Sequence, residues 1–217
     1  MAIEHHPSEA TLLDYAAGAL GERLALLVAG HLALCPVCRG DIAAAEAVGG
    51  GMLDGLAPER LAGDARDRML ARLAEPSPAA KPPAARVDDP ALPQPLAAYF
   101  GKPLAALPWT WILPGLRQVD LDPRQRGGTK LRLLRVGPGR AMPLHGHGGI
   151  ELTLVLTGAY RDELGRFARG DFAETDEAIT HQPRVDGTEE CICLIATDAP
   201  VRFPGRIARL VQRFTGI

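Results

Sequence analysis

A short stretch in the second half of the chain, His145-Gly-His147-Gly-Gly-Ile-Glu151, contains two histidines and a glutamate. His145 and His147 are two residues apart, so on a β-strand both imidazoles point to the same face. Glu151 can return to that face across a short bend at Gly148-Gly149. Two imidazoles and a carboxylate that converge can bind a divalent cation such as zinc, manganese or iron. The residue types and their spacing therefore predict a metal site.

The same stretch resembles the first sequence motif of the cupin family. The pattern G-x5-H-x-H-x3-E-x6-G begins at Gly139 and ends at Gly158, and every fixed position of the motif is occupied. The alternative is that these polar residues are scattered over the surface, but the complete spacing argues against it. The resemblance implies an all-β cupin barrel, or jelly roll, that carries the metal site.

The second cupin motif, G-x5-P-x-G-x2-H-x3-N, can be counted from Gly170. Its Pro, Gly and Asn positions hold Asp176, Ala178 and Val185, so the turn residues depart from the motif. His181 nevertheless stands at the position of the ligand histidine. Because glycines supply the positive backbone angles of such turns, the change suggests a reshaped loop rather than a lost site. The resemblance implies His181 as the fourth ligand.

A second group of metal-ligand side chains, His31-x3-Cys35-x2-Cys38, lies near the N-terminus. Residues Glu22–Leu34 have the apolar periodicity of a helix, and Pro36 fits the first turn of the next helix. His31 and Cys35 then share one helix face, and Cys38 lies one turn beyond Cys35. The spacing predicts three ligands that meet at one helix–helix corner.

A tetrahedral zinc site needs a fourth ligand, and the two histidines that precede the first helix are the candidates. This arrangement resembles the zinc-binding anti-sigma domain, in which an N-terminal histidine joins an H-x3-C-x2-C set. The resemblance implies the ligand set His6, His31, Cys35 and Cys38, with His5 as the less favoured substitute. The alternative is a C-x2-C redox pair with His31 as a core histidine. Zinc would supply much of the folding free energy, typically about 10–16 kcal/mol in zinc-binding peptides.

Two further cysteines, Cys191 and Cys193, are two apart on an expected strand and must face the same way. If they face the core, they are small buried residues, which is the more common outcome and the interpretation we favour. If they line the barrel near His181, they are oxidisable thiols beside a metal and suit a redox sensor. The sequence leaves both alternatives open.

Three parts of the chain position these side chains. The first part, residues 1–74, is expected to form a small all-α zinc-binding module. Ser8 fits a helix N-cap, and apolar residues recur at helical spacing as far as Leu20. A further amphipathic helix is expected over Asp64–Glu75, separated from the preceding helix by the Gly49-Gly50-Gly51 run and the loop around Pro58. Its apolar side needs a partner surface unless the helix folds back on its own module.

The other two parts are a linker and a β-domain. Residues 75–95 carry seven prolines among alanines and are predicted to be a semi-rigid spacer that keeps two folds independent. Residues 96–217 contain short alternating runs separated by turn residues, the pattern of a single β-barrel, followed by a helix over Pro204–Phe214. The expected strands are Thr110–Ile112, Arg117–Leu121, Leu131–Val136, Leu152–Leu156, Arg166–Phe167 and Cys191–Ala196. The fold class is therefore α+β, in two domains.

Composition argues against several classes of function. Hydrophobic residues make up 47% and charged residues 23%, and the net charge of −2 gives no reason to expect nucleic-acid binding. Residues 1–10 lack the basic-then-apolar pattern of a signal peptide. No apolar run approaches the length of about 20 residues needed to span a bilayer. We therefore expect a cytoplasmic protein with neither nucleic acid nor membrane as a partner.

A zinc anti-sigma module joined by a linker to a cupin resembles the ChrR type of anti-sigma factor over almost the whole chain. The resemblance implies a non-enzymatic regulator that forms a 1:1 complex with an extracytoplasmic-function sigma factor. It also implies that oxidative stress, including singlet oxygen and organic peroxides, is sensed through the cupin and releases sigma. The main alternative is a metal-dependent cupin enzyme such as a small dioxygenase, which could use the same His3Glu site. Zinc-dependent DNA binding is weakened by the mild acidity of the chain.

Overall fold

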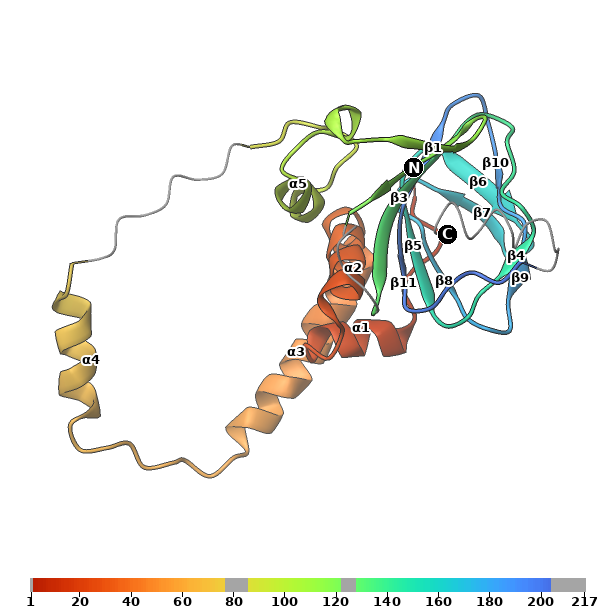
Figure 1. Cartoon of the computed structure of the whole chain (residues 1–217). Coiled ribbons are helices and arrows are strands. Elements are labelled where there is room, and N and C mark those ends of the chain that lie inside the picture. Colours follow the sequence, from red (N-terminus) through yellow and green to blue (C-terminus); the bar gives the residue numbers. More distant parts are fainter. Residues whose placement is uncertain (1, 77–85, 122–127, 204–217) are drawn as a thin grey trace.

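The structure, a computed structural model, describes residues 2–76, 86–121 and 128–203. In these residues the helices come first and the strands follow, as Figure 1 shows. The prediction of a helical region followed by a β-rich domain is thereby confirmed. The helix expected over Pro204–Phe214 and part of the expected linker lie outside the described residues.

The helices of the described residues fall into an N-terminal group and a short pair that leads into the strands. They are α1 (Glu9–Ala16), α2 (Glu22–Leu34), α3 (Pro36–Asp54), α4 (Ala65–Ala74), α5 (Gln94–Phe100) and the 3-10 helix η1 (Leu104–Ala106).

Local sequence explains where α1 begins. The side chain of Ser8 accepts a hydrogen bond from the N–H of Thr11 at 3.2 Å, which satisfies one free donor of the first turn. The helix ends at Ala16 rather than at the expected Leu20, and Gly18 beyond it has a φ of 69°. A residue in the left-handed region stops a helix, and glycine enters that region at no steric cost.

The corner between α2 and α3 matches the prediction. Helix α2 covers Glu22–Leu34, and Pro36 is the first residue of α3, where its missing N–H costs nothing. Cys35, between them, has the extended angles φ −101° and ψ 109°. This single extended residue bends the path by 118°, so the last turn of α2 faces the first turn of α3.

The end of α3 and the helix that follows are exposed. Helix α3 continues through Gly49-Gly50-Gly51 to Asp54, so the glycine run does not end it as the sequence had suggested. Helix α4 has no buried residue and stands apart from the other helices and the β-domain in Figure 1. Its apolar side chains Met69, Leu70 and Leu73 are 61%, 46% and 75% exposed, which does not support the alternative that α4 folds back.

The β-domain contains one large sheet and two smaller ones. The large sheet has the strand order β1-β2-β3-β11-β5-β8, and the smaller sheets are β10-β6-β7 and β4-β9, with all pairs antiparallel. The strands are β1 (Thr110–Leu113), β2 (Leu116–Asp120), β3 (Lys130–Val136), β4 (His145–Gly146), β5 (Glu151–Thr157), β6 (Ala159–Asp162), β7 (Gly165–Ala168), β8 (Phe172–Thr175), β9 (Thr180–His181), β10 (Arg184–Val185) and β11 (Cys191–Thr197). All six expected strands are present, whereas β4, β6, β8, β9 and β10 were not predicted.

One apolar core extends from the helices into the β-domain. Leu27 of α2, Leu96 of α5 and Leu154 of β5 are fully buried in a single cluster. Gly30 allows α2 to approach closely, since a Cβ there would lie 2.9 Å from Leu154 Cδ2. Leu92, within the expected linker, is buried in the same core. The helical module therefore packs against the barrel instead of lying free beyond a spacer, as Figure 1 shows.

Within the described residues, no single helix is both long and apolar enough to cross a membrane. Helices α2 and α3 meet the length and composition requirements only as a pair, across their bend of 118°.

Two candidate metal centres

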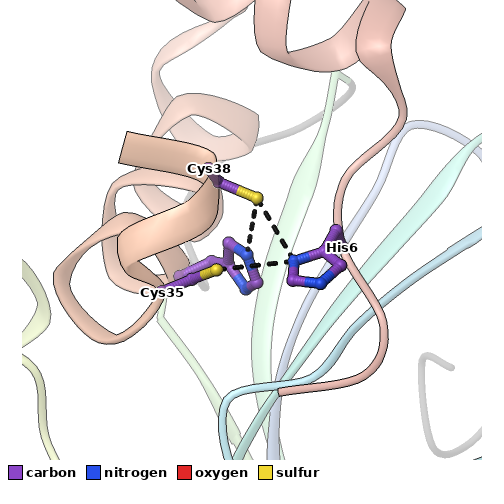
Figure 2. A group of neighbouring side chains, drawn as sticks. His6, Cys35 and Cys38 are labelled. Atoms are coloured by element: carbon purple, nitrogen blue, oxygen red, sulfur yellow. Dashed lines mark hydrogen bonds between the residues drawn. The ribbon is translucent and has the colours of Figure 1, made fainter. Parts of the chain in front are cut away.

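The first candidate centre lies at the corner between α2 and α3. His31 comes from the last turn of α2, Cys35 from the corner itself and Cys38 from the first turn of α3. His6 arrives from the segment before α1, and in Figure 2 its ring faces both sulfur atoms. One ligand atom from each of the four side chains lies within 4.8 Å of all the others.

The distances in this group suit a tetrahedral zinc ion. His6 Nδ1 is 3.4 Å from Cys35 Sγ and 3.3 Å from Cys38 Sγ, and His31 Nε2 is 3.3 Å from Cys38 Sγ. A zinc ion about 2.3 Å from sulfur and about 2.0–2.1 Å from nitrogen separates such atoms by about 3.5 Å. His31, Cys35 and Cys38 are buried and His6 is exposed, so the group is open to solvent on one side.

Without a cation, burial favours the neutral forms of Cys38 and His31. Burial raises the pKa of the Cys38 thiol to about 12, with a further contribution from the hydrogen bond to Cys35. Burial also lowers the pKa of His31. A zinc ion would reverse the balance for Cys38, because it binds the thiolate form, while a neutral imidazole is already the form that it binds. The donor set therefore suits zinc, which two thiolates and two imidazoles commonly bind.

His5, the sequence alternative to His6, lies outside this group. Its ring stacks on Phe167 with 4.1 Å between centroids, and its Nε2 is 3.1 Å from the carbonyl oxygen of Arg166. The two adjacent histidines thus face different parts of the molecule. Of the two, the structure brings only His6 together with His31 and the cysteines.

The second candidate centre lies in the β-domain, where two very short strands pair. In the β4–β9 pair, His145 is directly opposite His181. His147 follows β4, and Glu151 is the first residue of β5. The bend between them needs glycine, since a Cβ at Gly149 would lie 2.2 Å from Asp198 Oδ1. All four predicted ligands are buried, with their ligand atoms within 4.8 Å of one another.

Three Nε2 atoms converge at this centre. His181 Nε2 is 3.2 Å from His145 Nε2 and 3.1 Å from His147 Nε2. His145 Nδ1 donates to the carbonyl oxygen of Pro143 at 2.8 Å, and His181 Nδ1 donates to Asp162 Oδ2 at 2.8 Å. Both rings then present an unprotonated Nε2, and two such lone pairs repel each other unless a cation lies between them. A tetrahedral zinc ion separates two ligand nitrogens by about 3.3 Å, so the group fits a metal.

Burial shifts the protonation equilibria of His145, His147 and Glu151 toward their neutral forms. Burial lowers the pKa values of His145 and His147 to about 4 and raises the pKa of Glu151 to about 7. Both shifts oppose an ion pair between His147 Nδ1 and Glu151 Oε2, which are 3.6 Å apart. A divalent cation binds neutral imidazoles and a charged carboxylate, so a bound cation would stabilise the ionised form of Glu151 that burial disfavours.

Asp162 supports the second centre from outside the ligand set. Its side chain is 1% exposed, and besides accepting the bond from His181 it accepts one from the N–H of Leu164 at 2.9 Å. It therefore fixes the tautomer and ring orientation of His181 from the β6–β7 hairpin. The sequence does not mark Asp162 as part of the site, because no spacing in the chain indicates that β6 and β9 come together.

A small cavity of about 60 Å³ adjoins the second centre. Its walls include His145, Glu151 and His181 together with the thiols of Cys191 and Cys193. The two sulfur atoms are 3.7 Å apart, and their mutual hydrogen bond and burial raise the pKa of Cys193. Both sequence alternatives describe these cysteines in part, since they are buried among apolar residues and also line the cavity that the ligands line.

Comparison with known proteins extends over almost the whole chain. Residues 100–200 match the family model described as the ChrR Cupin-like domain. Over 215 residues, 99% of this chain and 99% of the relative, the sequence is 44% identical to the anti-sigma-E factor ChrR of Cereibacter sphaeroides. The fold is similar to the crystal structure of Rhodobacter sphaeroides SigE in complex with the anti-sigma ChrR, with a TM-score of 0.78 and 41% identity. That match covers 91% of this chain and 100% of the other.

Proposed function

Because this chain belongs to the ChrR family of anti-sigma factors, we propose that it binds an extracytoplasmic-function sigma factor in a 1:1 complex. The complex forms in the cytoplasm and keeps sigma from RNA polymerase, with no direct contact to nucleic acid or membrane. The family relative is a regulator and not an enzyme, so the dioxygenase alternative loses its support. The observation that carries the proposal is that the likeness to ChrR includes the helical region as well as the cupin.

Two uncovered apolar surfaces support sigma binding by the helical module. A groove of about 560 Å³ lies between α1 and α3, and its lining includes the exposed side chains of Leu13, Val37 and Val48. Helix α4 exposes the apolar side chains of Met69 and Leu73. A sigma factor that covers both surfaces would bury apolar area that faces water in the free chain, which favours a stable complex.

The proposed cofactors follow from the two donor sets. His6, His31, Cys35 and Cys38 would hold zinc, which would fix the corner between α2 and α3 and the segment before α1. The set His145, His147, Glu151 and His181 would hold zinc, manganese or iron, because imidazole and carboxylate ligands suit all three. The division into residues 1–74, a linker over 75–95 and a cupin over 96–217 remains our proposal for the functional units, with the end of the linker around Leu92 packed into the shared core.

The cupin would act as the sensor of oxidative stress, such as singlet oxygen or organic peroxides. Cys191 and Cys193 are candidate redox residues, because their sulfur atoms are 3.7 Å apart in the wall of the metal cavity. Oxidation of the two thiols, or of a ligand to the metal, would change the interior of the barrel. A changed barrel that binds the helical module differently would alter the hold on sigma.

Sigma binding is tested by co-expression of the full chain with candidate extracytoplasmic-function sigma factors, followed by co-purification and transcription in vitro. We expect one sigma factor to co-purify in equal amount and to lose activity when the protein is present. Failure of every such sigma factor to bind would overturn the proposal.

The sensing role is tested by the His145→Ala variant in a strain that carries a sigma-dependent reporter. We expect the variant to hold sigma in unstressed cells and to fail to release it after exposure to singlet oxygen. Normal induction, with the variant present at the usual level, would contradict a sensing role for this metal centre.

A further inference from the structure

The turn Ala168–Phe172, between β7 and β8 of the cupin, contacts the N-terminal centre directly. His31 Nδ1 donates to the carbonyl oxygen of Gly170 at 2.8 Å, in a buried contact between residues 139 positions apart. Because Nδ1 carries the proton, Nε2 presents its lone pair to the thiols and lies 3.3 Å from Cys38 Sγ. The cupin carbonyl thus fixes both the tautomer and the ring orientation of one ligand.

The next residue of the turn, Asp171, holds the segment that carries His6. Its Oδ1 accepts hydrogen bonds from the backbone N–H groups of Glu4 at 2.7 Å and His5 at 3.0 Å. The N–H of Phe172 donates to the carbonyl oxygen of His5 at 3.1 Å. Asp171 is only 3% exposed, so water competes little for its bonds. Both backbone polar groups of the residue just before His6 are therefore fixed by the cupin.

The two thiols are positioned in another way. Cys35 and Cys38 belong to the corner between α2 and α3, and the helical backbone itself sets their separation. The centre thus has two thiols placed by the helices, one imidazole of α2 whose ring is oriented by the cupin, and one imidazole whose backbone segment is held by the cupin. We propose that the Ala168–Phe172 turn is the outer shell of the N-terminal zinc centre, so that the zinc affinity of the helical module depends on the cupin.

The same turn is joined to the second centre through β5. The N–H of Gly170 donates to the carbonyl oxygen of Val155 at 2.9 Å, and the N–H of Val155 donates to that of Asp171 at 3.1 Å. Strand β8 then pairs with β5 as far as Thr175, which lies opposite the ligand Glu151. A change at either centre can therefore reach the other through two paired strands, and such coupling acts equally in both directions.

The regulatory consequence rests on the proposed function. A cupin whose turn has shifted would hold His6 and His31 less firmly and would weaken the zinc centre of the module that binds sigma. The outer-shell role itself concerns only zinc affinity, so it can be tested without a sigma factor.

The test uses Gly170→Ala in the full chain, with Gly187→Ala as its matched control. Gly170 has a φ of +94°, and a Cβ there would lie 2.8 Å from Ile3 Cδ1, so alanine strains the turn and presses on the N-terminal segment. Gly187 has a φ of +114° and nothing within 4 Å of an added Cβ, so alanine brings comparable backbone strain without pressing on any neighbour. Asp171→Asn is the second variant, because it removes the charge without a change in backbone or size.

The measurement is cobalt(II) binding followed by displacement with zinc. Cobalt bound by thiolates has a sulfur-to-metal charge-transfer band that a His3Glu site lacks, so this band reports the N-terminal centre alone. We expect Gly170→Ala and Asp171→Asn to weaken metal binding there about 10- to 100-fold, the usual effect of losing an outer-shell contact, and Gly187→Ala to leave it unchanged. Metal content of the cupin verifies that each variant is folded.

Unchanged affinity in Gly170→Ala and Asp171→Asn would overturn the outer-shell role, as would an equal loss in Gly187→Ala. If Gly170→Ala does not fold, Asp171→Asn alone decides. Sigma co-purification separates this result from the proposed function. If Gly170→Ala and Asp171→Asn lose zinc affinity but the wild-type chain binds no sigma factor, only the proposed function is refuted. If the wild-type chain binds a sigma factor but both variants keep wild-type zinc affinity, only the outer-shell role is refuted.

Discussion

His5 and His6 are neighbours in the chain, yet their rings face different parts of the molecule. His6 Nδ1 lies within 3.4 Å of both thiols, whereas His5 stacks on Phe167 of the cupin. An imidazole that completes a tetrahedral set affects metal affinity directly, whereas one that packs on a distant ring acts only through the position of its backbone. The two residues therefore form a matched pair for mutation.

We predict that His6→Ala weakens zinc binding at the N-terminal centre far more than His5→Ala does. Loss of one of four ligands leaves a three-coordinate site, while loss of the His5 ring removes only packing and one hydrogen bond. The measurement is competition for zinc with a chromophoric chelator, on full chains of equal concentration. A larger loss in His5→Ala would show that the ligand assignment is reversed.

Asp162 provides the corresponding prediction for the cupin centre. Asp162→Asn keeps the size of the side chain but removes the carboxylate that holds His181 Nδ1–H, so we expect metal affinity to fall about 10- to 100-fold. Glu163→Gln is the control, because this adjacent carboxylate contacts the backbone N–H of Gln182. Metal retained after dialysis against a weak chelator measures the difference, and equal retention by both variants would rule out a positioning role for Asp162.

The contrast between ligands and supporting residues shows what sequence can predict at this scale. Ligand types and spacings are set by the metal and by one local element, so His31-x3-Cys35-x2-Cys38 and His145-x-His147 could be recognised from the chain alone. Asp162 and Asp171 contact groups that only the folded barrel brings near them. No local pattern marks such a residue, since a carboxylate in a hairpin or turn looks like any other solvated charge.

At the scale of elements, α4 is an amphipathic helix whose apolar side is uncovered. We predict that the double variant Met69→Ser, Leu73→Ser weakens sigma binding by about 2 kcal/mol or more, roughly 30-fold. A few anchor side chains contribute most of the binding energy at such interfaces, and this variant removes two of them. Both residues are exposed in the free chain, so its free energy of unfolding should change by less than about 0.5 kcal/mol.

Ala71→Ser is the control for this variant, because helical spacing places Ala71 on the side of α4 opposite Met69 and Leu73. Titration of labelled sigma factor with each protein gives the affinities. Equal affinities for the control and the double variant would remove α4 from the binding surface.

Most long elements were predicted from the sequence, whereas the two-residue strands were not. Helix α2 and strand β3 contain enough apolar repeats to define a period. The bounds of α2 are those expected, and β3 begins one residue earlier than expected. Strands β4, β9 and β10 have two residues each, too few for any periodicity, and they exist because the barrel brings their partners together. The glycine run in α3 led to the opposite error. Glycine has a poor helix propensity and was expected to end the helix, yet the helix continues through all three glycines to Asp54.

At the scale of the whole molecule, the helical module and the barrel share a core. The sequence indicated which face of α2 is apolar but not which surface covers it, and the proline-rich segment suggested that the two folds are independent. In the structure, Leu27 and Gly30 of α2 face Leu96 and Leu154, so part of the apolar face of the helix is covered by the cupin side of the chain. Separation along the sequence is therefore a poor guide to independence in space.

A shared core predicts that the helices and the barrel unfold together. Gly30→Val would place new methyl groups where even a Cβ lies 2.9 Å from Leu154 Cδ2, and we expect such overpacking to cost about 1–3 kcal/mol. For a chain of this size, each kcal/mol lowers the melting temperature by about 2–4 °C. Gly40→Val is the matched control, because Gly40 is also inside a helix but has nothing within 4 Å of its added Cβ.

Two optical signals distinguish the parts during thermal unfolding. Circular dichroism at 222 nm mainly follows the helices, and fluorescence follows Trp109 and Trp111, which lie on the cupin side of the chain. Coincidence of the two transitions is the test of a single cooperative unit. We expect Gly30→Val to lower both midpoints equally and Gly40→Val to lower neither. If Gly30→Val lowers the helical midpoint alone while the tryptophan transition stays in place, the two folds are independent and the shared core contributes little to their stability.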